Sequence, residues 1–73
     1  MSKSIELARE LVEQKASGFA STIGLMSNND LVFKTRKEVP GWLKDGRLGG
    51  MNHQDRQQVK AWAVEAVMRE AGR

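Results

Sequence analysis

The sequence predicts a small α+β domain: a helix, an antiparallel β-hairpin, a glycine-rich loop and a second helix in that order. Two stretches with helical apolar spacing frame the chain, and between them apolar residues alternate as they do in a strand. A cluster of turn-forming residues divides this central stretch. The chain has 73 residues and no internal repeat, so we expect one domain covering residues 1–73.

The first helix is predicted to begin at Ser2 or Ser4, because either hydroxyl can cap a helix, and to end near Ala16. Gly18 then fits the left-handed position that closes many helices. One face of this helix, flanked by Leu7, is expected to pack in the core. Its residues are Ile5, Ala8, Leu11, Val12, Lys15 and Ala16.

The hairpin is predicted over residues 19–36. Residues 19–26 alternate in the manner of a strand, and residues 31–36 resume the alternation. Between them, residues 27–30 read Ser-Asn-Asn-Asp, which favours a four-residue turn. In the second strand Phe33 would share one face with Leu31 and Thr35. Lys34 and Arg36 would project together from the other face, with Val32.

Pro40 and Gly41 predict a turn after the hairpin, because proline disfavours helix and glycine can supply a positive φ. Trp42 follows at once, and its indole could enter the core or stay on the surface. A glycine-rich loop then covers residues 44–50, with Leu48 and Met51 expected to attach its far end to the core.

The C-terminal helix is predicted over residues 52–71. Asn52 can cap its start, Asp55 suits its positive first turn, and Gly72 suits its end. Trp62 is expected to contribute more to the small core than any other side chain. The apolar stripe of this helix consists of Val59, Trp62, Ala63, Ala66 and Val67.

The composition excludes several classes of protein. There is no cysteine, so neither a disulfide nor a thiolate zinc site can form. No apolar run approaches the roughly 20 residues that span a bilayer, and charged residues interrupt any signal-peptide core at the N-terminus. We therefore expect a soluble, cytoplasmic protein.

Two weak signals for chemistry remain. His53 with Asp55 could form a general base or part of a metal site, but no further ligands accompany them. Gly46, Gly49 and Gly50 precede a helix, but they match neither of the glycine patterns that bind nucleotide phosphates. We expect no enzymatic activity, no cofactor and no metal.

The net charge of +3 is concentrated in the middle of the chain. Such a basic patch can attract an acidic protein surface or nucleic acid. The predicted protein-binding residues, in which a tryptophan is surrounded by cations, are Lys34, Arg36, Lys37, Trp42 and Arg47. The alternative is a winged-helix or excisionase-like DNA-binding protein, whose contacts would come from Lys34, Arg36, Arg56 and Lys60.

The chain is small and contains no cysteine, and two of its stretches carry a resemblance: residues 1–7 (Met-Ser-Lys-Ser-Ile-Glu-Leu) and the basic segment 34–47. In these features and in length the chain resembles the small host-takeover proteins of bacteriophages, most of all an RNA-polymerase-binding antitermination factor of a Xanthomonas phage. The resemblance implies a non-enzymatic transcription regulator that binds bacterial RNA polymerase in the host cytoplasm and modulates initiation or termination. It assigns no role to individual residues.

Overall fold

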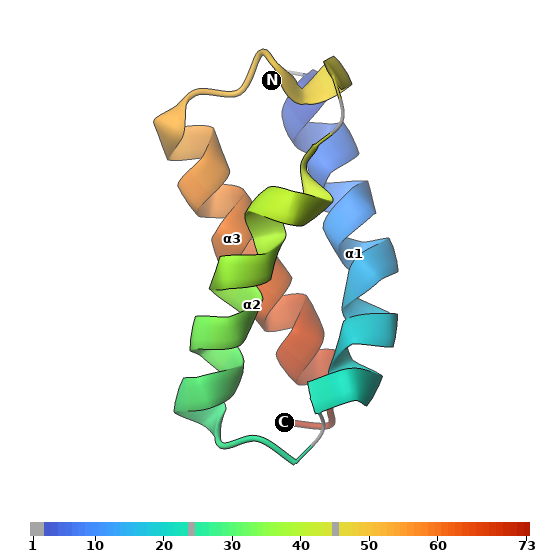
Figure 1. Ribbon diagram of the computed structural model, residues 1–73. Helices are drawn as coiled ribbons and strands as arrows, with labels where there is room; N and C mark the ends of the chain where they lie inside the picture. The colour runs from blue at the N-terminus through green and yellow to red at the C-terminus, as the bar shows by residue number, and fades with distance from the viewer. Residues whose placement is uncertain (1–2, 24, 45) are drawn as a thin grey trace.

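The chain folds as a bundle of helices that run alternately down, up and down the long axis (Figure 1). The described helices are α1 (Lys3–Ile23), α2 (Asn28–Trp42), the short 3₁₀ helix η1 (Gly46–Leu48) and α3 (His53–Glu70). The bundle is elongated, with extents of 35 × 19 × 19 Å. The predicted α+β fold with a hairpin is wrong, because the described residues contain no strand.

The structure is a computed structural model that describes residues 3–23, 25–44 and 46–73. Ser2, one of the two predicted caps of the first helix, lies outside these residues. None of the described helices combines the length and the apolar character that crossing a membrane requires.

The predicted first strand belongs largely to α1, which continues past Ala16 and Gly18 to Ile23. The reason lies in the spacing of buried residues: Ala8, Val12, Ala16 and Ala20 follow one another at intervals of four and are almost completely buried. This stripe extends a helical face directly through the stretch that alternates like a strand. Gly18 is therefore an interior helical residue, where glycine costs about 1 kcal/mol relative to alanine.

The predicted hairpin turn is the start of α2. Ser27 is the N-cap of that helix, and its hydroxyl oxygen accepts a hydrogen bond of 3.3 Å from the backbone N–H of Asp30. Asp30 also places a carboxylate in the positively polarised first turn. The same short polar side chains that favour a turn also favour a helix N-terminus, because both uses depend on local bonds to the backbone.

Pro40 and Gly41 lie inside the last turn of α2 instead of forming a separate turn. Proline is excluded from helix interiors because it cannot donate a backbone hydrogen bond. Here the helix ends two residues later, and the N–H of Leu43 donates to the carbonyl of Val39 at 3.1 Å. The predicted turn at Pro40 and Gly41 is therefore wrong, because both residues are helical and α2 ends only at Trp42.

The C-terminal helix is confirmed as α3. Asn52 and Asp55 form a reciprocal capping box, in which the side chain of each accepts a hydrogen bond from the backbone N–H of the other. At the other end Gly72 has a φ of 78°, the left-handed conformation expected after a helix. Leu48 and Met51 are buried, which confirms that they fix the glycine-rich loop to the core.

The core consists of two clusters stacked along the bundle axis, and α1 and α3 contribute to both. The cluster toward the N-terminal end of α1 contains Ala8, Val12, Val39, Leu43, Leu48, Met51, Val59 and Ala63. The second contains Ala16, Ala20, Ile23, Leu31, Ala66 and Val67. Trp62 is half-buried against the first cluster only, whereas Trp42 packs against both and meets the Phe19 ring edge-on at 5.3 Å.

A polar side chain separates the contributions of α2 to these clusters. Thr35 lies one helical turn from Leu31, in one cluster, and one turn from Val39, in the other. It is completely buried, and its hydroxyl has no hydrogen-bond partner. A buried hydroxyl without a partner costs about 1–3 kcal/mol of desolvation.

We predict that Gly18→Ala increases the free energy of unfolding by about 0.5–1 kcal/mol, because the new Cβ meets nothing within 4 Å and alanine favours helix. Urea unfolding followed by circular dichroism measures this change. Gly72→Ala is the matched control and should be destabilising, since its φ is positive. A loss of stability in Gly18→Ala would indicate instead that Gly18 has a positive φ at the end of the first helix, as the sequence predicts.

We predict that Thr35→Val increases the free energy of unfolding by about 1 kcal/mol, because it replaces an unpaired buried hydroxyl with a methyl group of similar size. Thermal and urea unfolding test this. Thr22→Val is the control: its exposed hydroxyl donates to the carbonyl of Gly18 at 3.2 Å, so the change should be small. Destabilisation by Thr35→Val would mean that the Thr35 hydroxyl is hydrogen-bonded in solution.

Candidate functional site

Three of the predicted protein-binding residues, Lys34, Arg36 and Lys37, lie on α2 and are exposed. In a helix, residues two apart are separated by about 200° around the axis, so Lys34 and Arg36 flank opposite sides of α2. Lys37 lies between them on the outward side. The prediction that Lys34 and Arg36 project from one face of a strand is therefore wrong, and the cations instead surround the exposed half of a helix.

Arg36 is directed toward α3. Its guanidinium donates a hydrogen bond of 3.4 Å to the side-chain oxygen of Gln57, which is half-buried. Lys60 is three residues after Gln57 and so lies on the same side of α3. The structure therefore brings Arg36, one of the four residues predicted to contact DNA, to the contact between α2 and α3. Of the other predicted residues on α3, Lys60 is half-buried and Arg56 is exposed in the first turn.

Phe33 is the side chain that the sequence reasoning placed wrongly. As part of a strand it would have shared a face with Leu31 and Thr35, but in the helix it lies outside and is 69% exposed. The ammonium group of Lys37 lies 6.0 Å from the centre of its ring, at the outer limit of a cation–π interaction. Helical spacing of Leu31, Thr35 and Val39 was the signal that would have identified Phe33 as exposed.

The other two predicted protein-binding residues are separate from this group. Trp42 is half-buried between the core clusters, so most of its indole serves the fold. Arg47 is exposed on η1, and its backbone carbonyl accepts a hydrogen bond of 3.0 Å from the hydroxyl of Ser4. Figure 1 shows η1 beside the start of α1, beyond the end of α2. The five residues are thus divided into three exposed cations on α2, a half-buried tryptophan at the end of the same helix and an outlying cation on η1.

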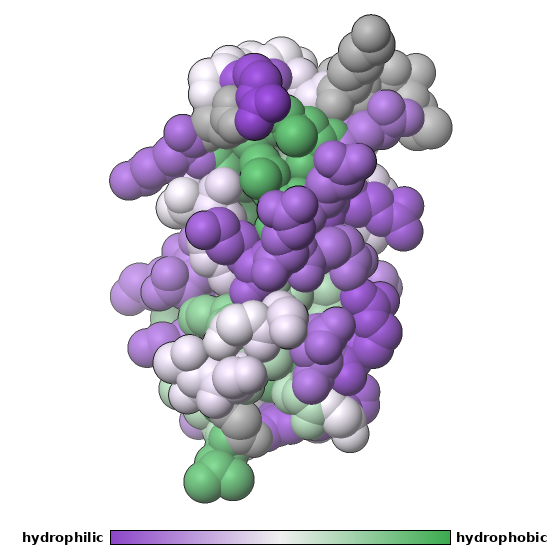
Figure 2. All heavy atoms as spheres, turned by 90° about the vertical axis from the view of Figure 1, so that its right-hand side faces the viewer, coloured by the Kyte–Doolittle hydropathy of each residue, from purple (hydrophilic) through white to green (hydrophobic). Residues whose placement is uncertain are grey.

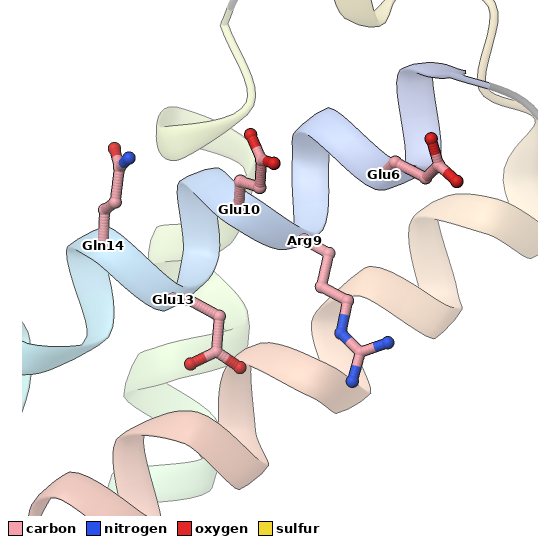
Figure 3. Close-up of a pocket in the computed structure, with 5 residues that line it drawn as sticks. All are labelled: Glu6, Arg9, Glu10, Glu13 and Gln14. Atoms are coloured by element: carbon pink, nitrogen blue, oxygen red, sulfur yellow. The ribbon is translucent and has the colours of Figure 1, made fainter.

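A second surface feature is an open hollow of about 580 Å³ along α1, lined by Glu6, Arg9, Glu10, Glu13 and Gln14 (Figure 3). Arg9 and Glu13 point toward α3: the guanidinium of Arg9 lies 4.8 Å from the Trp62 ring centre, and Glu13 pairs with Arg69. The face that α1 presents is mostly hydrophilic (Figure 2). These contacts join α1 to α3, so Arg9 and Glu13 contribute to the fold.

The two weak chemical signals gain no support from the geometry. The described residues contain no group of three or more histidines or carboxylates that could hold a metal ion. His53 is exposed in the first turn of α3. The capping box occupies backbone donors at this helix start, and the Asp55 carboxylate would repel a phosphate there.

Comparisons with protein-family models, with curated proteins and with solved structures found no match to this chain.

Proposed function

We propose that this chain is a non-catalytic transcription regulator that binds bacterial RNA polymerase through the exposed half of α2. The observation that carries the proposal is the group of exposed cations, Lys34, Arg36 and Lys37, on one helix beside an exposed aromatic ring. Cations around an apolar centre are typical of surfaces that bind acidic proteins. The identity of the partner rests on the resemblance to phage proteins, which also places the protein in the bacterial cytoplasm.

The proposed mechanism is steric and electrostatic. A helical body of 35 × 19 × 19 Å that is bound along α2 would occupy a subunit surface and exclude other factors or nucleic acid from it. No covalent step is involved. Arg47 would contribute at the margin of the contact, whereas Trp42 would support α2 from beneath by packing against both core clusters.

The alternative, a winged-helix or excisionase-like DNA-binding protein, depends on a β-hairpin that the described residues do not form. A winged or excisionase-like protein uses a hairpin against the phosphate backbone, and residues 19–23 and 28–36 are helical. What remains is a set of cations along the α2–α3 contact. Binding to duplex DNA through such cations would depend steeply on salt, because each neutralised phosphate releases counterions.

We predict that the double variant Lys34→Glu/Lys37→Glu binds purified RNA polymerase at least about tenfold more weakly than the unchanged chain, because two attractive contacts become repulsive. Fluorescence anisotropy of the labelled protein measures the affinity. The control Lys15→Glu/Arg56→Glu makes the same change in net charge at exposed sites on α1 and α3 and should retain binding.

Three results would contradict the proposal. The first is the absence of polymerase binding in the unchanged chain. The second is an equal loss in the control variant, which would reduce the contact to net charge. The third is tighter binding to duplex DNA than to polymerase, with an affinity that falls steeply between low and physiological salt.

A further inference from the structure

The outward face of α2 combines an aromatic ring with two cations. Phe33, Arg36, Lys37 and Pro40 are spaced i, i+3, i+4 and i+7, so they share one side of the helix, and all four are exposed. We call these four residues the Phe33 face. They extend over about 10 Å of helix, at 1.5 Å per residue.

The chemistry of the Phe33 face specifies what can cover it. None of its four residues is acidic: Glu38 lies about 140° around the helix from Phe33, beside Lys34, and Asp30 lies on the side of Phe33 but one turn earlier, in the first turn of α2. A phenylalanine that is 69% exposed presents apolar area that only an apolar group can bury favourably. The matching surface therefore carries carboxylates on either side of an apolar side chain.

We infer that the Phe33 face docks an acidic amphipathic helix of a protein partner. An aliphatic or aromatic side chain of that helix covers the Phe33 ring, and its carboxylates pair with Arg36 and Lys37. A helix fits because its own residues at i, i+3, i+4 and i+7 form an equally straight row. The inference rests on the proposed function for its location and adds to it the chemical class of the partner segment and its anchor residue.

A nucleic acid matches the face less well. Single strands bind to several aromatic side chains in succession, each stacking on one base, whereas α2 presents one ring. A second copy of the chain is also a poorer match. Its acidic residues on α1 are interspersed with Arg9, and Glu13 is already paired with Arg69. Both remain distinguishable outcomes of the experiment.

The experiment is an NMR titration of the ¹⁵N-labelled chain with a synthetic helical peptide that has leucines on one side and glutamates beside them. The expected result is a set of amide shift changes centred on residues 33–40. Phe33→Ala should weaken binding about tenfold without loss of fold, because the side chain is exposed. Leu25→Ala is the matched control: among the described residues it removes the other large exposed apolar side chain, outside this face, and should leave the affinity unchanged.

Several outcomes would overturn the inference. Equal binding of a scrambled peptide of the same composition, or of a single-stranded oligonucleotide, would show that charge alone is recognised. Shift changes centred on other residues would place the peptide elsewhere, and shift changes at residues 33–40 that appear without peptide as protein concentration rises would assign the face to a second copy. Unchanged binding of the peptide by Phe33→Ala would show that the ring is not the anchor.

The inference and the proposed function fail separately. If Lys34→Glu/Lys37→Glu loses polymerase binding while Phe33→Ala keeps it, the function stands and the anchor assignment is wrong. If the peptide binds at the Phe33 face but purified polymerase does not bind, the surface stands and its partner is a different acidic protein.

Discussion

The close contact between α1 and α3 is the constraint on which the rest of the structure depends. These two helices contact each other more extensively than any other pair of described helices does, and many of the buried residues between them are small: alanines at three of the four buried positions spaced four apart on α1, and Ala63 and Ala66 on α3. Small side chains let helices approach closely and gain many dispersion contacts. A chain of 73 residues buries a smaller fraction of its surface than a larger protein does, and here that proximity replaces the large side chains of a bigger core.

The contact between α1 and α3 also explains which parts of the fold could be predicted. α3 was recognised because its signals are local: a capping asparagine at residue 52, an acidic residue in the first turn at Asp55, a stripe of apolar residues, and a glycine after the helix end at residue 72. The segment from Phe19 to Met26 was not, because eight residues of alternating character fit a strand as well as a helical stripe. Packing against α3 decides in favour of the helix, since Ala20 and Ile23 are buried in the same cluster as Ala66 and Val67.

For the candidate site, composition was predictable and arrangement was not. The excess of cations between residues 34 and 47 follows from the sequence, whatever the fold. Which of them share a face depends on the period of the backbone. A strand places Lys34 and Arg36 on one face and Phe33 on the other face with Leu31 and Thr35, whereas a helix separates the two cations and exposes Phe33 beside Lys37. A single error in the type of element therefore grouped the one exposed aromatic side chain on α2 with two residues that are buried.

The helix proposed to bind the partner, α2, is also the described helix whose buried face carries an unpaired polar group. It contributes one buried aliphatic residue to the second cluster, Leu31, and between Leu31 and Val39 it buries the unpaired hydroxyl of Thr35. The helix that carries the exposed ring and cations is thus also the one with a polar defect in its buried face. Departures from good local packing are expected where a chain retains residues for binding. A partner that covers Phe33 would bind the folded chain selectively and so stabilise it, which offsets the cost at Thr35 by mass action.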